Sequence, residues 1–446
     1  MKINNNIQAL NAYRNLNQNQ NQVSKNLEKL SSGLRINRAS DDAAGLAISE
    51  KMRSQIRGLK QSERNSMDGI SLMQTSEGAM QEIHSMLQRM RELAVQASND
   101  TNTEYDREQL QKEISELTKE IDSISDKTEF NTKKLLDGSS AVYSYLNEDE
   151  NNANLASPPV PLDTEMQPGD YSISVTEKSL KIDGADEVLS IQDEVTVNEN
   201  QRLGEYTIEV EDLDDESAFV TLYDDKGIEI DSQKISDEEQ SNVGGIELSL
   251  DDITAEGKSK FRLEAEGTFE LLIGAEDNIE LKEEVSTKDG KIQLGDLELE
   301  FSANISDGSS NFHVINNSLA FQIGPNTGQQ VMVDIPKMDA EKLGVDEVDV
   351  STHEGASKAI IQFDDAINHV SDARAKLGAV QNRMEHTVTN LQVTHENLTS
   401  SESRIRDADM AKEMTEFTRN NIINQSATAM LAQANQLPQG VLQLLQ

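Results

Sequence analysis

Two His–Glu pairs come closest, among the residues of this chain, to a catalytic arrangement. Zinc proteases place a second histidine four residues after the first, on the same face of a helix, with a glutamate between them as the general base. The positions four residues after His353 and His395 hold Ser357 and Thr399. Neither pair can therefore supply two zinc ligands, and the sequence predicts no catalytic residue.

Clustered carboxylates are the other candidates for chemistry, because they could bind Ca²⁺. The clusters 214–216 and 237–239 each consist of consecutive acidic residues, but a calcium loop needs ligands at alternating positions, a glycine and a terminal glutamate. The chain has no cysteine, which excludes disulfides and thiolate metal sites. It has no phosphate loop, nucleophile elbow or dinucleotide fingerprint. We therefore expect no metal, no cofactor and no enzyme activity.

The charge of the chain is concentrated in its middle. The formal net charge of the 446 residues is −41, of which residues 141–350 contribute −37, whereas residues 1–140 and 351–446 contribute −1 and −3. So acidic a surface argues against nucleic acid and against an anionic membrane as partners. No run of 18 apolar residues is present to span a membrane, and residues 1–13 lack the apolar core of an ordinary secretory signal.

Long helices are expected at both ends, because residues 1–157 and 337–437 contain no proline. In the first helix, apolar residues recur every seven positions until a break near Gly33. A second helix is expected from about Leu46 to a turn at 99–102, and a third has apolar residues at 4-3-4-3 spacing. The series of the first helix is Ala9, Leu16, Val23 and Leu30, with Leu27 between the last two. The series of the third helix is Leu110, Ile114, Leu117, Ile121 and Ile124.

The C-terminal region carries one seven-residue series, which predicts a single helix of about 45–50 residues. A helix of this length needs partners along it, and within the chain only the N-terminal helices can provide them. The predicted fold class is α+β and multi-domain: a long antiparallel helical bundle or coiled coil built from both chain ends, with an inserted all-β outer region. The series is Val370, Leu377, Met384, Leu391, Leu398 and Ile405.

The terminal segments lack the charged face that lets a surface helix meet water. Residues 420–446 contain no charged side chain, and the only charged side chain in residues 3–24 is that of Arg14. These segments are rich in Asn and Gln and too polar to enter a bilayer, so we expect burial against other helices, including those of further copies of the chain. The residues predicted to carry this self-assembly are Leu16, Val23, Leu27, Leu30, Leu391, Leu398, Ile405, Met430 and Leu437.

The middle of the chain alternates apolar and polar residues, which is typical of β-strands. Three segments, 169–175, 204–210 and 267–273, share a pattern of glycine, any residue, an aromatic residue and then alternating apolar residues. They suggest one or two small β-domains. Short strands are also expected within 128–138 and 319–335, where they would belong to the helical part.

Several stretches near the chain ends carry more specific information than periodicity. They are INNN (3–6), LSSGLRIN (30–37), ASDDAAGLAI (39–48), LQRMRELAVQ (87–96), FQIG (321–324), SRIRDADMA (403–411) and LPQGVL (437–442). Over about 1–140 and 310–446 the chain resembles bacterial flagellin, the filament subunit of the flagellum. The middle shares only the trait of a strand-rich outer region. Pro325 stands where we expect a small residue, which puts the hydrogen bonding of that strand in question.

The resemblance implies a division of labour. Residues 1–45 and 406–446 would form the terminal helical domain at the filament core, 46–138 and 306–405 a helical rod domain with short strands, and 139–305 the variable β-rich outer region. It also implies polymerisation into a helical homopolymer for swimming motility, type III export and an extracellular location. The flagellar chaperone, cap and hook-junction proteins would be partners. Two alternatives stay open: a hook–filament junction protein of the same family, and a filament protein with an enzymatic outer domain.

The resemblance further implies a receptor-binding surface. In many flagellins, Toll-like receptor 5 binds the rod surface around the stretch that matches 88–93 of this chain. Arg89 and Leu93 match two principal contacts of that surface, and Glu113, on the next helix, is matched to a third. The same residues are also expected to serve the packing of subunits, so a receptor would exploit what assembly requires.

Overall fold

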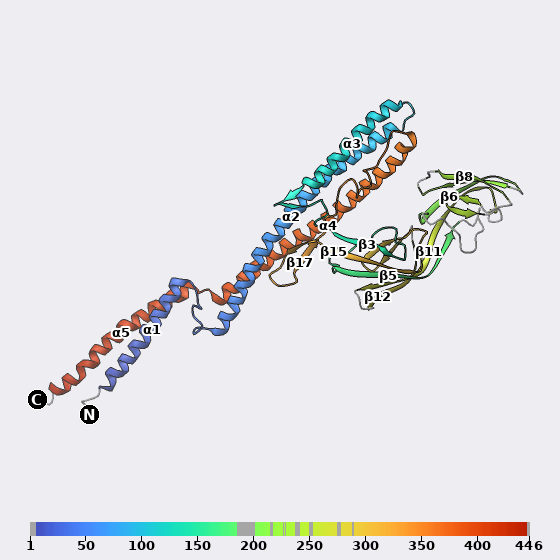
Figure 1. Cartoon of the computed structure of the whole chain (residues 1–446). Coiled ribbons are helices and arrows are strands. Elements are labelled where there is room, and N and C mark those ends of the chain that lie inside the picture. Colours follow the sequence, from blue (N-terminus) through green and yellow to red (C-terminus); the bar gives the residue numbers. More distant parts are fainter. Residues whose placement is uncertain are drawn as a thin grey trace. The chain divides into compact units, whose positions relative to one another are not determined.

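The computed structural model describes residues 6–184, 201–214, 217–225, 227, 229–236, 241–248, 253–273, 278–287 and 290–443. Helices come from both ends of the chain, and an antiparallel β region is inserted between them in the sequence (Figure 1). This arrangement confirms the predicted fold class. The chain forms two compact units. The first comprises Met1–Ser71, Phe321–Val331 and Ala379–Gln446, and the second comprises Leu72–Ala320 and Met332–Gly378.

In the first unit, α1 (Ile7–Ser32) and α5 (Met410–Gln443) lie side by side (Figure 1). Local signals set the bounds of α1. The side chain of Asn6 accepts a hydrogen bond from the backbone N–H of Ala9 (3.1 Å) and so caps the first turn. Gly33 ends the helix with a φ of +72°, the left-handed region that glycine adopts freely, and its N–H donates to the Lys29 carbonyl (2.8 Å).

A short link leads from α1 to α2 (Ala43–Ala97), and the stretch ASDDAAGLAI spans the end of this link and the first turns of α2. Asp42 Oδ1 accepts the backbone N–H of Gly45 (2.8 Å), which satisfies a donor in the first turn of α2. Asp41 accepts the N–H of Arg38 (3.0 Å), and this bond is the main cause of the lowered pKa of Asp41. A Cβ on Gly45 would lie 2.9 Å from Ile36 Cδ1. The motif is thus a compact turn with room only for glycine.

The hairpin of β16 (Leu319–Gln322) and β17 (Gln330–Val333) approaches α2 closely at two glycines. A Cβ on Gly58 would lie 2.7 Å from Pro325 Cβ, and a Cβ on Gly69 would lie 3.1 Å from the Phe321 ring. Pro325 lies in the loop between the two strands, so its missing N–H removes no hydrogen bond from the strand pair. The strand is therefore intact at this end, and the glycines of α2 mark a close approach.

In the second unit, α2 continues beside α3 (Glu104–Lys127) and the first part of α4 (His353–Arg406), as Figure 1 shows. A capping box of Thr103 and Asp106 starts α3 after the predicted turn. Gln111 donates to the Val348 carbonyl (2.8 Å) and accepts the Val350 N–H (2.7 Å), which holds the extended segment before α4. The largest fully buried side chains of this helical core are Met73, Met80, Ile83, Leu87, Met90, Leu93, Ile114, Ile121 and Phe363, and Val370 and Leu377 are buried beside them in α4.

The β region contains an eight-stranded sheet in the order β3-β15-β5-β11-β6-β7-β8, with β12 also paired to β11. All its strand pairs are antiparallel. Strands β13-β14-β4, β10-β9 and β1-β2 form smaller sheets. The bounds are β1 (Glu129–Phe130), β2 (Lys133–Lys134), β3 (Val142–Asn151), β4 (Val160–Pro161), β5 (Gly169–Asp183), β6 (Gly204–Asp214), β7 (Ser217–Tyr223), β8 (Glu229–Ser236), β9 (Ser241–Val243), β10 (Ile246–Leu248), β11 (Gly257–Ile273), β12 (Asn278–Ser286), β13 (Lys291–Leu294), β14 (Leu297–Glu300) and β15 (Gly308–Asn316).

The three segments with the shared aromatic pattern are neighbours in this sheet, in β5, β11 and β6. The aromatic residue of each segment packs against a second aromatic ring from another part of the β region. Such pairs add specific ring contacts to the burial of apolar area. The pairs are Tyr171–Phe312 and Tyr206–Phe261, with ring centroids 5.7 Å apart, and Phe269–Phe301, at 5.4 Å.

Candidate assembly surfaces

The pairing of α1 with α5 is fixed near both ends of the pair. Three contacts join the two helices or their flanking residues, and the sum of the two residue numbers is nearly the same in all three, 440 to 442. The pair is therefore antiparallel and keeps one register along its length. The contacts are Ala408 N–H to the Gly33 carbonyl (2.9 Å), Lys29 Nζ to Glu413 Oε1 (3.3 Å) and Asn6 Nδ2 to the Ala434 carbonyl (2.8 Å).

The covered residues of α1 and α5 form a seam, with the alternating three- and four-residue spacing of a coiled coil. Leu16, Val23 and Leu30 belong to it and are half-buried. Asn26 is buried in the seam at 7% exposure, whereas Leu27, one residue further around the helix, is 51% exposed. The seam consists of Ala9, Ala12, Leu16, Asn19, Val23, Asn26 and Leu30 in α1, and of Glu413, Phe417, Asn420, Asn424, Ala427, Leu431 and Ala434 in α5.

A set of large apolar side chains on α1 and α5 lies outside the seam and open to solvent. Their exposed fractions run from 40% for Ile423 to 63% for Met430. Leu437, predicted for the same role, lies in α5, but its side chain is outside the described part of the chain. We call these residues the outer apolar set: Ile7, Leu10, Tyr13 and Leu27 of α1, and Met410, Met414, Ile422, Ile423 and Met430 of α5.

Arg406 joins the base of this helix pair to α2. Its side chain, 11% exposed, donates to the Glu50 carboxylate, and this hydrogen bond is the main cause of the lowered pKa of Glu50. The backbone N–H of Arg35 donates to the Arg406 carbonyl (2.6 Å), and Leu34 forms a β-bridge with Asp407. The stretches LSSGLRIN and SRIRDADMA, far apart in the sequence, thus meet in one joint.

The seven-residue series of α4 is covered unequally along the helix. Its first half is at most 3% exposed, and at Met384 the cover comes from α2, where a Cβ on Gly69 would lie 2.8 Å from Met384 Cε. Its second half is half-buried, and there Gln392 of α4 donates to Glu63 of α2 (2.8 Å). The first half is Val370, Leu377 and Met384, and the second half is Leu391, Leu398 and Ile405.

The three residues matched to a receptor surface do not all lie on the surface. Arg89 and Glu113 form an exposed ion pair (2.9 Å), and Glu92 also contacts Arg89 (3.1 Å). The pKa of Arg89 is raised chiefly by the hydrogen bond to Glu113. Leu93 is 1% exposed and is a core residue, so its side chain is not available to a partner on this surface. Glu92 follows Arg89 by three residues on α2, a spacing at which helical side chains meet, so the sequence alone could have indicated this contact.

The chain matches the bacterial flagellin N-terminal helical region over residues 3–141 and the bacterial flagellin C-terminal helical region over residues 360–445. It is 41% identical to a flagellin of Clostridium tyrobutyricum over 448 residues, which cover 98% of this chain and 100% of the relative. The chain belongs to the bacterial flagellin family. It is also 37% identical to a flagellin of Bacillus subtilis (strain 168), over 100% of both chains.

Flagellins are structural proteins, so the chain is a structural protein of the flagellar filament and not an enzyme. Solved structures with similarity include a flagellar hook-associated protein 3 of Legionella pneumophila, with TM-score 0.36, 13% identity and coverage of 80% of this chain and 98% of that one. FliC of Burkholderia pseudomallei has TM-score 0.26, 19% identity and coverage of 71% and 99%. These likenesses are too distant to favour the junction-protein alternative.

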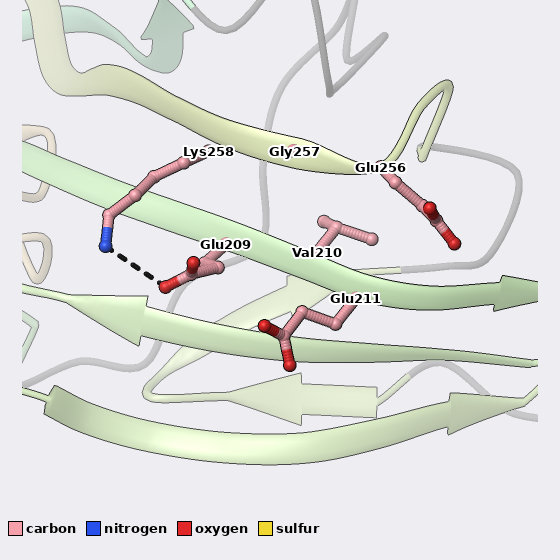
Figure 2. Close-up of a pocket in the computed structure, with 6 residues that line it drawn as sticks. All are labelled: Glu209, Val210, Glu211, Glu256, Gly257 and Lys258. Atoms are coloured by element: carbon pink, nitrogen blue, oxygen red, sulfur yellow. Dashed lines mark hydrogen bonds and ion pairs between the residues drawn. The ribbon is translucent and has the colours of Figure 1, made fainter.

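In the acidic β region of this flagellin, several basic side chains lie opposite carboxylates on neighbouring strands, among them Lys258, Arg262 and Lys282. Figure 2 shows one such site, a shallow hollow in which Lys258 of β11 contacts Glu209 of β6 (3.0 Å), with Glu211 and Glu256 nearby. No group of acidic or histidine side chains suited to a metal ion is found in the described ranges. The cluster 237–239 and residues 215–216 lie outside those ranges. Among the described helices, none is long and apolar enough to cross a membrane.

Proposed function

We propose that the chain polymerises into the flagellar filament through the outer apolar set, which α1 and α5 of neighbouring copies would cover. The supporting observation is the exposure, 40–63%, of large apolar side chains on two helices that carry few charges. Full burial of one such side chain stabilises by roughly 1.5–3 kcal/mol. A second copy of the chain presents the same apolar surface, so burial between copies brings apolar side chains together and desolvates only the few charged side chains on these helices, such as Arg14 and Arg419.

Two isoleucine variants test this proposal. Ile422→Glu places a charge in the outer apolar set, where the wild-type side chain is 57% exposed, and Ile230→Glu places one on the β region, where it is 43% exposed. We expect Ile422→Glu to remain in the supernatant when seeded polymerisation is followed by sedimentation, and Ile230→Glu to form filaments. Polymerisation of Ile422→Glu at the wild-type yield would contradict the assignment of the surface.

The division of the chain into functional parts belongs to the same proposal. Residues 1–45 and 406–446 would form the filament core, residues 46–138 and 306–405 the rod, and residues 139–305 the outer region. Membership of the flagellin family supports an extracellular location, reached by type III export, with the flagellar chaperone, cap and hook-junction proteins as partners. Detection of the chain in sheared filaments from living cells, but not from cells without the export apparatus, tests this route.

Recognition by Toll-like receptor 5 is supported by the exposed Arg89–Glu113 pair alone, because Leu93 is buried. Arg89→Ala should weaken receptor signalling by the soluble chain. Arg91→Ala is the matched control, since Arg91 is similarly exposed on α2 and pairs with Asp364 of α4 (2.5 Å). Equal signalling by Arg89→Ala and the unchanged chain would remove the only support for this role.

A further inference from the structure

The seam between α1 and α5 contains asparagine where a stable helix pair would have apolar residues. Asn26 and Asn420 are 7% and 5% exposed, and Asn19 and Asn424 are half-buried. The register of the pair places Asn19 beside the turn of α5 that carries Asn420 and Asn424. Leucine at these positions would bury more apolar surface. In coiled coils, a buried asparagine lowers stability but selects one register.

A charged pair lies one turn further along the same seam. Lys29 Nζ is 3.3 Å from Glu413 Oε1, and the two side chains are 28% and 11% exposed. Asn26 Nδ2 and Glu413 Oε2 are buried and have no hydrogen-bond partner within the described residues. A slip of α1 along α5 would separate Lys29 from Glu413 and leave a buried carboxylate without its cation. Such a loss costs more than the intact pair contributes, so the pair acts mainly against other registers.

We infer that the seam asparagines and the Lys29–Glu413 pair select the register of α1 against α5, at the expense of the stability of the helix pair. The inference rests on the proposed function, because the register decides where the outer apolar set of one copy meets that of the next. A slip of one heptad would move that set by about 10 Å. Apolar contacts are non-directional, so a seam of leucine and alanine alone would tolerate the slip.

Disulfide mapping tests the register directly, because the chain has no cysteine. Ala12→Cys with Ala427→Cys joins seam positions in the observed register, whereas Ala12→Cys with Ala434→Cys joins them only after a slip of one heptad. A disulfide forms when the two Cα atoms are within about 7 Å. In filaments we expect the first pair to form an intramolecular disulfide at least about tenfold more than the second, measured by non-reducing electrophoresis.

The same mapping is repeated with Asn19→Leu and Asn420→Leu. We expect the slipped disulfide to rise to within about threefold of the in-register one. Asn17→Leu with Asn421→Leu is the matched control, because these neighbouring asparagines are exposed, and it should keep the tenfold preference. An unchanged preference after replacement of Asn19 and Asn420 overturns the inference. If the unmodified chain forms no filament, the proposed function fails, and mapping on the soluble chain decides the register by itself.

Charge exchange separates register selection from a loss of folding. Lys29→Glu should reduce the preference for the in-register disulfide, because two carboxylates then meet in the seam. Lys29→Glu with Glu413→Lys restores opposite charges and should restore the preference. Failure of the double variant to recover the preference would show that the ion pair does not set the register.

Discussion

The close approach of the β16–β17 hairpin to α2 leads to a prediction about two glycines of that helix. In a helix interior, replacing glycine by alanine stabilises by about 1 kcal/mol. A Cβ on Gly78 would meet no atom of the described residues within 4 Å, so Gly78→Ala should show the full gain. A Cβ on Gly58 would lie 2.7 Å from Pro325 Cβ, about 1 Å inside the preferred carbon–carbon separation.

The proline ring cannot rotate away from Gly58, so the loop of the hairpin must move. Overpacking of this kind costs about 1–3 kcal/mol, which cancels or exceeds the gain in helix propensity. We expect Gly58→Ala to be less stable than Gly78→Ala by about 1–3 kcal/mol, measured by urea unfolding of the soluble chain with helical circular dichroism. Equal stabilisation by both variants would refute the reasoning, because it would mean that the hairpin does not rest on α2 at Gly58.

Three further predictions concern the burial of particular side chains and the charge of the β region. Leu391→Glu should prevent assembly yet destabilise the soluble chain less than Val370→Glu, since Leu391 is half-buried and Val370 is 0% exposed. A buried unpaired charge costs several kcal/mol. An equal loss of unfolding free energy in the two variants, measured with urea, would contradict the prediction. Burial is the main cause of the raised pKa of Asp334, opposed by the hydrogen bond from the Val142 N–H, so its charge weakens the fold as pH rises through that pKa. Asp334→Asn should therefore stabilise at pH 7 but not below pH 3.8, the ordinary pKa of an aspartate, and unfolding measurements at pH 7 and below pH 3.8 test the difference. Finally, a chain in which a short flexible bridge replaces residues 142–316 should polymerise at lower salt than the full chain. The reason is that repulsion between charges reaches about 30 Å at 0.01 M salt and only about 8 Å at physiological salt. If the shortened chain needed higher salt to polymerise, the outer regions would attract each other.

The boundaries of that deletion come from the structure. A loss of about 145–305, which the acidic composition alone suggests, would cut β3 and remove β5, the two strands that pair with β15. The backbone N–H of Asn317 donates to the Ala141 carbonyl (3.2 Å), so these two residues already lie together. Removal of 142–316 takes away whole strands and leaves ends that a few residues can join. An unpaired strand edge, a ready site for aggregation, is thereby avoided.

The helices could be predicted from the sequence because two strong signals agree. Proline is absent and the heptad pattern is regular, and the turn at 99–102 and the break at Gly33 were found at their observed places. The shared aromatic pattern also identified three neighbouring strands. What the β-strand pattern does not contain is which strands pair, since an alternating segment fits several neighbours. The strand order therefore came only from the structure.

The seam of α1 was harder to predict because two spacings compete there. Val23, Leu27 and Leu30 form one apolar series, while Val23, Asn26 and Leu30 lie on the covered face. Hydrophobicity favours leucine over asparagine, so a sequence-based choice selects Leu27. In the structure Asn26 is the covered residue instead, because the facing residues of α5 include polar side chains. Those residues lie about 400 positions further along the sequence, so the pattern of α1 alone does not reveal them. The burial of Leu93, in contrast, could be predicted from the sequence, since Leu93 adjoins the regular core series Leu87, Met90 and Ala94.

The terminal helices depart from the usual distribution of polarity at several positions, although most residues of the seam are apolar. An amphipathic helix ordinarily turns its apolar stripe to its partner and its polar face to water. Here amides such as Asn26 and Asn420 face the partner helix, and side chains such as Ile422 and Met430 face outward. Ordering costs roughly 1–2 kcal/mol per residue of backbone, over helices of 26 and 34 residues, and a seam in which several positions are asparagine or alanine offsets only part of it. We expect burial of the outer apolar set to supply the rest, so that the order of these helices would depend on neighbouring copies. The near absence of charge then has a physical reason, because neighbours can cover this surface from several sides without burying an unpaired ion.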